Sequence, residues 1–463
     1  MQTSLILTSE QRQQLAQHLL PADGCEAVAV VLCGMAQTNG CRRLIAREIH
    51  LVPHDVCTVR QPDRVTWPTE VMLPWLAVAE KRNHAVLKIH GHWGFNRFSE
   101  TDDHADQQLF PSIYSWVGGI AVHGSAVLLN DGSLFGRIVN ERGGFEPFDT
   151  VHVVGDDIEI FRYEALEREV PGHARRIAQT FGSKTFETLR RLKVGVVGVS
   201  GTGSPVVEQL ARNCVGTLVL VDPDHIEHKN LNRIINSTWA DADAATLKVD
   251  VAKRAITAMG LGTEVTTFAT TLFDRDVVKE LSTCDLLIGC MDTIDGRHLL
   301  NKLATFYSIP YFDLGVKIVA DGEGGVSQVV GTVHYLRPGG SSLLSRKVYG
   351  LEHVRAAGLK RTDPENYAQL LEEGYIRGIQ EDRPAVVQLN TLLASLAVNE
   401  VLARLHPYRL DANGFYNVTR VSLSHGFLTY EHDGEPCTVL ARHVGRGDVE
   451  PLLDNPELSI KTK

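Results

Sequence analysis

The stretch KVGVVGVSGTGSPVVEQLARNCVGTLVLVD, residues 193–222, decides the fold of the larger part of this chain. Its first apolar, β-branched residues predict a buried strand over 193–199. A glycine-rich turn follows, and then a helix in which Ser204 is placed to cap the first turn and Pro205 occupies the first helical position. A second apolar run ends at Asp222. This order of strand, turn, helix and strand predicts a βαβ unit.

The residues that follow repeat the alternation of strands and helices. Apolar runs predict strands at 284–292 and 310–316, and VVQLNTLLASLAVNEVLARL predicts a long helix over 386–405. This pattern is typical of a doubly wound, Rossmann-like parallel sheet, which we place at 193–430, followed by a C-terminal tail at 431–463.

The first 155 residues form a different pattern, in which short β-rich runs alternate with turns. We expect a small α/β sandwich at 1–155, with helices near the start and around 70–83; the strands are expected at 27–35, 44–52, 86–93, 120–129 and 135–139. The charged segment 156–192, broken at Pro171 and Gly172, is expected to connect the two domains through entry helices. The fold class is therefore α/β in both parts.

Composition excludes several classes of protein. The chain has 463 residues, of which 43% are hydrophobic and 22% charged, which is typical of two or three globular domains. A net charge of −10 argues against a nucleic-acid partner. No apolar run is long enough to span a membrane, and the first residues do not form a secretory signal. The eight cysteines are scattered without a C-x-x-C pair, so we expect a cytoplasmic protein without disulfides.

The glycine turn predicts a phosphate site. Backbone N–H groups around Gly198, Gly201 and Gly203, together with the start of the following helix, form an anion site suited to phosphates. Asp222, at the end of the next strand, is placed to accept hydrogen bonds from ribose hydroxyls. These features alone fit a nicotinamide-dependent dehydrogenase equally well.

Cationic residues farther along favour ATP over a nicotinamide cofactor. The run VDPDHIEHKNLNR (221–233), Lys248 and the run MDTIDGR, with Asp292, Asp295 and Arg297, supply charges that can bind phosphates and Mg²⁺. The combined pattern closely resembles the ThiF/HesA/MoeB family, the adenylating cores related to ubiquitin-activating enzymes, over about residues 173–408.

The resemblance implies roles for individual residues. Asp222 would bind the ribose, Arg233 and Lys248 the phosphates, Asn230 the triphosphate end, and Asp292 Mg²⁺. The family also has an arginine six residues before a glycine that reaches into the partner subunit's site. Arg176 keeps this spacing to Gly182, so the resemblance implies a homodimer.

The sequence departs from the family's pattern at the phosphate turn and at the thiol. Ser200 replaces a glycine, and Ile234 stands where Gln is common. Ser342 and Ser345 stand where the family commonly has cysteines, which leaves Cys437 as the one late thiol candidate. Because a serine hydroxyl is a poor substitute for a thiolate, we expect transfer to an external thiol or sulfur donor.

The N-terminal domain contains a candidate metal site in HGHWGFNRFSETD, residues 90–102. His90 and His92 are two apart on a strand, so both side chains point to the same face. With Asp102 they supply three ligands and leave a fourth zinc position open for water, as in catalytic zinc sites. Taken alone, an H-x-H pair is also compatible with two ordinary histidines.

The wider pattern H-x-H-x6-S-x-x-D resembles the signature of the JAB/JAMM metalloproteases, which cleave isopeptide or peptide bonds after ubiquitin-like proteins. The resemblance covers about residues 5–145 and implies Zn²⁺ on His90, His92 and Asp102. It implies Glu26 as general base, with Glu48 as a competing choice, and Ser99 as an oxyanion stabiliser. Trp93 replaces the proline that usually follows the second histidine, and the spacer to Ser99 is about one residue shorter than is common.

Together these patterns predict a bifunctional enzyme with Zn²⁺, ATP and Mg²⁺ as cofactors. One domain would trim or release the C-terminus of a ubiquitin-like or sulfur-carrier protein, and the other would adenylate the exposed glycine carboxylate. The resemblance suggests bacterial conjugation-like systems, some in antiviral defence, or sulfur transfer. The alternative is a partly or wholly non-catalytic scaffold that binds a modifier or a nucleotide.

Overall fold

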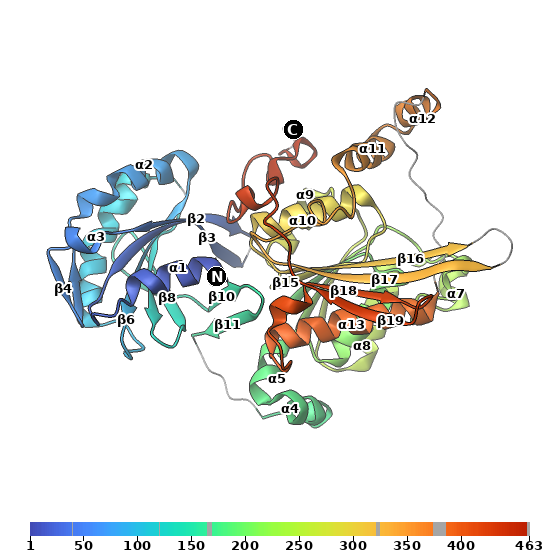
Figure 1. Ribbon diagram of the computed structural model, residues 1–463, viewed down its shortest axis with the longest axis horizontal. Helices are drawn as coiled ribbons and strands as arrows, with labels where there is room; N and C mark the ends of the chain where they lie inside the picture. Colours follow the sequence, from blue (N-terminus) through green and yellow to red (C-terminus); the bar gives the residue numbers. More distant parts are fainter. Residues whose placement is uncertain (39, 120, 164–168, 321–324, 374–385, 461–463) are drawn as a thin grey trace. The chain divides into compact units, whose positions relative to one another are not determined.

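The computed structural model describes residues 1–38, 40–119, 121–163, 169–320, 325–373 and 386–460 (Figure 1). The chain divides into two compact units. Unit 1 comprises residues 1–167, 306–308 and 444–449, and unit 2 comprises 168–305, 309–443 and 450–463. The first border between the units lies inside the segment 156–192 that we expected to connect two domains.

Unit 1 is built on a nine-stranded sheet with the order β11-β10-β1-β3-β2-β6-β7-β8-β9. Its strands are β1 Gln2–Thr8, β2 Val28–Gln37, β3 Cys41–Leu51, β6 Ala85–His92, β7 Gly124–Leu129, β8 Leu134–Val139, β9 Phe145–Pro147, β10 Thr150–Val154 and β11 Ile158–Arg162. A separate hairpin joins β4 Val59–Gln61 and β5 Arg64–Thr66. The run expected as a strand over 120–129 becomes one only at Gly124, and residue 120 lies outside the described residues.

Helices pack on both faces of this sheet, as the period-two pattern of its strands requires. On β6, Leu87 and Ile89 belong to the core that includes helix α1 (Ser9–Leu19). Val86 belongs to the opposite core, formed with α2 (Leu73–Arg82) and α3 (Glu100–Val117). Alternate residues of a strand point to opposite faces, so His90 and His92 lie on the α2/α3 face.

The short segment 444–449, which we expected to belong to the C-terminal tail, is part of unit 1. Its backbone runs so close to β2 that a Cβ atom at Gly34 would lie 2.2 Å from the carbonyl oxygen of Gly445. Asp448 anchors the segment: its N–H donates to the carbonyl of Met35, and its carboxylate accepts from the Tyr307 hydroxyl at 2.9 Å. A stretch from the end of the chain thus completes the N-terminal unit.

Unit 2 contains an eight-stranded sheet with the order β14-β13-β12-β15-β16-β17-β18-β19. The strands are β12 Lys193–Val197, β13 Thr217–Val221, β14 Glu264–Phe268, β15 Leu286–Gly289, β16 Tyr311–Ala320, β17 Val326–Leu336, β18 Val418–Ser422 and β19 Phe427–Glu431. The first five are parallel, as the βαβ pattern predicts, and β17 to β19 add an antiparallel edge that we did not expect. The order reverses between β12 and β15, which is where ligands bind in doubly wound sheets.

The helices of unit 2 are α4 Arg175–Phe181, α5 Ser183–Arg190, α6 Gly203–Arg212, α7 Trp239–Asp243, α8 Lys248–Met259, α9 Arg275–Leu281, α10 Ile294–Phe306, α11 Leu351–Thr362, α12 Pro364–Glu372 and α13 Val387–Leu405. Helix α13 packs against α6, β16 and β17. The expected capping role of Ser204 is wrong: α6 already begins at Gly203, and the Ser204 hydroxyl accepts a hydrogen bond from the backbone of Ile235 instead.

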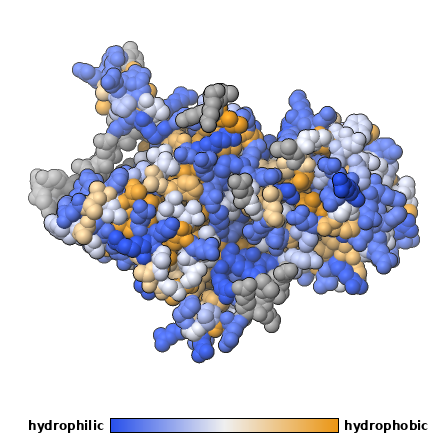
Figure 2. Space-filling view, turned by 180° about the vertical axis from the view of Figure 1, so that it is seen from behind, coloured by the Kyte–Doolittle hydropathy of each residue, from blue (hydrophilic) through white to orange (hydrophobic). Residues whose placement is uncertain are grey.

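Surface and thiol properties agree with the composition. On the face shown in Figure 2, hydrophilic and hydrophobic residues are interspersed over both units. No helix among the described residues is long and apolar enough to cross a membrane. All eight cysteines are free thiols.

Candidate functional site

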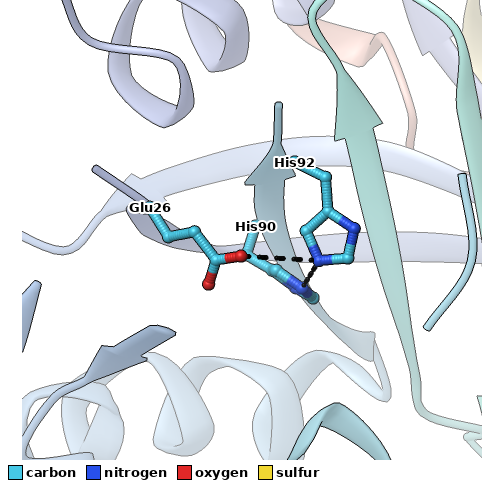
Figure 3. A group of neighbouring side chains, drawn as sticks. All are labelled: Glu26, His90 and His92. Atoms are coloured by element: carbon cyan, nitrogen blue, oxygen red, sulfur yellow. Dashed lines mark hydrogen bonds and ion pairs between the residues drawn. The ribbon is translucent and has the colours of Figure 1, made fainter. Parts of the chain in front are cut away.

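Two histidines and a glutamate form a buried cluster at the end of β6 in unit 1. His90 and His92 lie side by side, and Glu26, just before β2, points toward them (Figure 3). The two Nε2 atoms are 2.9 Å apart, and the Glu26 carboxylate lies 3.6 Å from Nε2 of His92. One donor atom from each residue lies within 4.8 Å of the others, so the three side chains could hold a metal ion.

Asp102 joins this cluster from the first turn of α3. Its carboxylate lies 3.0 Å from Nε2 of His90 and 3.7 Å from Nε2 of His92. Ser99 caps the helix: its hydroxyl donates to the Asp102 carboxylate at 2.7 Å and accepts from the Asp102 N–H at 3.1 Å. The four residues that the sequence analysis connected, Glu26, His90, His92 and Asp102, therefore converge.

The donor set fits a zinc ion. Nδ1 of His92 lies 2.9 Å from the carbonyl of Phe95, which favours a proton on that nitrogen and leaves a lone pair on Nε2. Nδ1 of His90 is buried and has no hydrogen-bond partner among the described residues. Two imidazole nitrogens and a carboxylate are the ligand types that zinc prefers, and a second carboxylate stands beside them.

Burial shapes the charges in this cluster. Burial, and then the nearby carboxylates of Asp102 and Asp63, raise the pKa of Glu26 to about 8 in the metal-free cluster. Burial alone would also raise the pKa of Asp102, but hydrogen bonds from His90 and Ser99 outweigh it and hold that pKa well below its usual value. The pKa values of the two carboxylates are therefore shifted in opposite directions.

The structure also shows where the other residues considered for this site lie, namely Glu48, Ser99 and Trp93. Glu48, the competing glutamate, forms an ion pair with Arg82 on α2 at 2.5 Å and is not in the cluster. The Ser99 hydroxyl is engaged with Asp102, so it positions that carboxylate; donating to an oxyanion would break this bond. Trp93 follows β6 with 43% of its surface exposed.

A buried charge network fixes α3 against the sheet, and the sequence analysis missed it. Asp106 is fully buried and pairs with Lys88 of β6, with Arg137 at 2.8 Å and with the Ser125 hydroxyl. Arg137 also lies over the rings of Phe98 and Phe145. Lys88 precedes His90 by two residues on the same strand face, so the network connects the helix that carries Asp102 with the strand that carries the two histidines.

The glycine turn of unit 2 requires residues without a side chain at Gly198 and Gly203. A Cβ atom at Gly203 would lie 1.9 Å from the carbonyl oxygen of Gly198, which is a clash with backbone. Gly198 has φ +90°, a conformation that favours glycine. The Gly198 N–H donates to the carbonyl of Val221 at 2.8 Å, which ties the turn to the end of β13. The turn therefore leads directly into the first turn of α6.

Asp222 and Lys248 lie beside this turn. The buried Asp222 carboxylate accepts hydrogen bonds from the backbone N–H groups of Val199 at 2.7 Å and Asp224 at 3.0 Å. Burial raises the pKa of Asp222, although Lys248 acts against that shift. The Lys248 ammonium lies 2.7 Å from Asp224 and 3.9 Å from Asp222, so the lysine is brought to the strand ends.

Arg233 also reaches the turn. A Cβ atom at Gly201 would lie 3.2 Å from Cδ of Arg233, so the arginine stem lies over that glycine. The guanidinium donates to the carbonyl of Lys229 at 2.7 Å and remains exposed. Asn230 is buried, and its Oδ1 accepts from the Glu227 N–H at 3.0 Å, which holds the loop before Arg233; a contact with the triphosphate stays a prediction.

The remaining predicted residues of unit 2 lie on different elements. Asp292 is exposed just after β15, at the same edge as the glycine turn, whereas Arg176 is exposed on α4. Asp295 and Arg297, which the sequence analysis considered for phosphates and Mg²⁺, are both buried and paired with other residues. Asp295 pairs with Arg361 at 2.9 Å, and Arg297 pairs with Asp313.

No reactive thiol is presented where the family's cysteines were expected. Ser342 and Ser345 close a turn on each other, each hydroxyl accepting from the other residue's N–H at 2.9 and 3.1 Å. Cys437 is 2% exposed, and its sulfur accepts a hydrogen bond from the backbone of Leu440.

Comparisons with known proteins concern mainly unit 2. The ThiF family matches residues 173–436. The chain is 29% identical over 169 residues to ubiquitin-like modifier-activating enzyme 5 of Drosophila willistoni, covering 34% of this chain and 39% of that protein. It is 28% identical over 157 residues to the adenylyltransferase and sulfurtransferase UBA4 of Meyerozyma guilliermondii, covering 34% and 36%. The chain thus spans less than two fifths of the length of these relatives.

Among solved structures, a crystal structure of E. coli MccB with ATP has a TM-score of 0.43 at 18% identity, covering 58% of this chain and 75% of that chain.

Proposed function

This chain belongs to the ThiF family, and on that premise we propose that unit 2 adenylates the C-terminal glycine carboxylate of a ubiquitin-like or sulfur-carrier protein. A carboxylate oxygen attacks the α-phosphorus of ATP, the bond to the β-phosphate breaks, and an acyl adenylate and pyrophosphate result. One observation carries the proposal: the glycine turn, Asp222, Arg233 and Lys248 meet at the carboxyl ends of β12 and β13.

Each residue has a task that follows from its position. The backbone N–H groups of the turn and the start of α6 would hold phosphates, and Asp222 would accept from ribose hydroxyls with its remaining lone pairs. Lys248 would exchange its ion pair with Asp224 for a phosphate oxygen. Mg²⁺, held by Asp292 and phosphate oxygens, would offset the charge of the departing pyrophosphate.

The acyl adenylate would pass to an external thiol or sulfur donor, because Cys437 is buried. One relative is named a sulfurtransferase as well as an adenylyltransferase, which supports a sulfur-transfer outcome. Arg176, exposed on α4, is available to the site of a second subunit in a homodimer.

Pyrophosphate exchange tests the adenylation. Purified protein, ATP, Mg²⁺ and labelled pyrophosphate are incubated with peptides or modifiers that end in glycine. We expect exchange that Lys248→Ala lowers about 100-fold or more. Lys253→Ala, on the same helix but exposed, is the matched control and should leave the rate unchanged. The absence of exchange with every glycine-ended tail would overturn the proposal.

For unit 1 we propose metal-dependent cleavage at the C-terminus of the same modifier. The observation that favours it is the convergence of Glu26, His90, His92 and Asp102. A bound Zn²⁺ would polarise the scissile carbonyl and activate water. Glu26, whose carboxylate lies 3.6 Å from Nε2 of His92, would take a proton from water and deliver it to the leaving amine.

Metal analysis and tail cleavage separate the roles of the two carboxylates. Asp102→Asn should lose both stoichiometric zinc and cleavage, whereas Glu26→Gln should keep zinc and lose cleavage. Glu48→Gln, which alters the glutamate paired with Arg82, is the matched control and should retain both. Wild-type protein that binds no zinc and cleaves no tail, like Glu26→Gln, would favour a non-catalytic scaffold.

The two activities suit one chain because they act on one peptide end in sequence. Cleavage exposes the glycine carboxylate that adenylation consumes, and a shared chain raises the local concentration for the second step. Nucleotide preference tests the remaining alternative: protection against thermal unfolding by NAD but not by ATP with Mg²⁺ would favour a dehydrogenase.

A further inference from the structure

We propose that Asn390 is a nucleotide-positioning residue whose side-chain amide donates a hydrogen bond to a phosphate oxygen of ATP on the glycine turn. This inference rests on the proposed function of unit 2. Asn390 lies in the first turn of α13, and only 1% of its surface is exposed. It is separated by 188 residues from Thr202 of the turn, and the fold brings the two together.

The amide is oriented but only half satisfied. Its Oδ1 accepts from the Thr202 hydroxyl at 3.4 Å, whereas Nδ2 is buried and has no hydrogen-bond partner among the described residues. A buried amide donor without a partner is unfavourable and uncommon in native proteins. Such a donor is satisfied when a ligand brings an oxygen to it.

The unpartnered nitrogen faces the glycine turn. A Cβ atom at Gly201 would lie 2.6 Å from Nδ2 of Asn390 and 3.2 Å from Cδ of Arg233. The amide, the glycine and the arginine stem therefore meet at one point. Because glycine leaves this point without a side chain, a group bound on the turn can contact both the amide and the backbone.

A buried network fixes the rotation of α13 and hence the direction of the amide. Glu400 accepts from Arg404 at 2.8 Å and from Arg409 at 3.1 Å, and only 2% of its surface is exposed. Arg404 also donates to Asn417 at 3.0 Å. A preorganised donor of this kind suits a charged phosphate oxygen, to which hydrogen bonds are stronger than to neutral acceptors.

Nucleotide binding by the full chain tests the inference. We would measure the Kd of ATP with Mg²⁺, AMP and adenosine by calorimetry for wild type and for Asn390→Leu, which keeps the branched shape. We expect about tenfold or more weaker ATP binding with unchanged adenosine binding. Without nucleotide, the melting temperature should not fall, because the variant removes an unpartnered buried donor. Comparing AMP with ATP locates the contacted phosphate.

Two variants complete the design. Asn399→Leu alters an exposed asparagine on the same helix, whose amide already donates to the carbonyl of Ser395, and should bind ATP normally. Asn390→Asp keeps the acceptor for Thr202 but replaces the donor with a carboxylate, so it should weaken ATP binding more than Asn390→Leu does and spare adenosine. This second variant preserves the test if Asn390→Leu misfolds.

The outcomes separate the two proposals. Unchanged ATP binding in both Asn390 variants, or an equal loss for ATP and adenosine, would overturn this inference alone. Wild-type protein that binds no ATP would overturn the proposed function of unit 2 and this inference with it.

Discussion

Each unit contains a helix that starts with the same S/T-x-x-D pattern, and the two starts can be compared directly. In α3 the Ser99 hydroxyl donates to Asp102 at 2.7 Å, and in α7 the Thr238 hydroxyl donates to Asp241 at 2.6 Å. The aspartate N–H donates back at 3.1 and 3.3 Å. As helix caps, the two motifs are nearly identical.

They differ in what meets the free side of the carboxylate. Asp102 faces His90 at 3.0 Å and His92 at 3.7 Å, whereas Asp241 pairs with Arg254 at 2.7 Å. The Arg254 side chain is 54% exposed, but both imidazoles are buried. The pattern therefore specifies a helix start, and the neighbouring strand decides whether the aspartate meets the histidines of the candidate metal cluster.

The variant with the largest expected effect tests whether the buried charges around Asp106 hold α3 against the sheet. Asp106→Ala leaves Lys88 and Arg137 buried without their shared carboxylate, so we expect a loss of about 3–5 kcal/mol of unfolding free energy. Arg254→Ala removes an ion pair whose arginine side chain is 54% exposed and leaves Asp241 its hydrogen bonds from Thr238, so it should cost about 1 kcal/mol or less. Urea denaturation measures both.

Tryptophan emission follows mainly unit 1 in this experiment, because four of the five tryptophans belong to it: Trp67, Trp75, Trp93 and Trp116. Far-UV circular dichroism reports on both units. Equal, small losses in Asp106→Ala and Arg254→Ala would contradict the view that buried charge fixes α3.

The next effect concerns metal affinity. Ser99→Ala removes the hydroxyl that orients Asp102, so we expect zinc affinity to fall about 10- to 100-fold, measured by competition with a chromophoric chelator. Thr238→Ala removes the equivalent cap in α7. Each variant should lose about 0.5–2 kcal/mol of stability, but Thr238→Ala should bind zinc like wild type. Equal zinc affinity in both variants would mean that Asp102 does not depend on its cap.

The smallest effect is a pH dependence at α7. Hydrogen bonds from Arg254, and then from Thr238, hold the pKa of Asp241 below its usual value of about 4. A lowered folded-state pKa stabilises the protein above the unfolded value and loses that contribution as pH falls below about 4. The stability difference between wild type and Arg254→Ala should therefore be greatest above pH 4 and shrink in acid. Urea midpoints from pH 6 to pH 3 measure it, and a difference that grows in acid would reverse the assignment.

Much of this fold could be predicted from local pattern. Period-two alternation placed His90 and His92 on one face, and the βαβ order placed Asp222 at a strand end beside the glycine turn. Both follow from chain geometry that acts over a few residues. The cap of α6 was predicted two residues too late, at Ser204 instead of Thr202, and the Ser204 hydroxyl accepts a hydrogen bond from the backbone of Ile235 instead.

What escaped prediction depends on contacts between distant segments. Asp106 looks like an ordinary polar residue of a helix until α3 is docked against β6 and β8. Asn390 stands in an apolar helix far along the chain from the turn that it faces. A local sequence pattern cannot predict such pairs, because they depend on how a helix is rotated and on the order of the strands in the sheet.

The placement of residues 444–449 in unit 1 has a practical consequence for dissecting the protein. A fragment that stops near residue 163 would lack segment 444–449, which lies against Gly34. It would also lack the hydrogen bond between Asp448 and Tyr307 that anchors this segment. Cutting the chain once, at the connector, therefore cannot yield an intact N-terminal module. The two catalytic proposals are therefore better separated by point substitutions than by truncation. A gene split at this junction would have to include residues 444–449 with the N-terminal half.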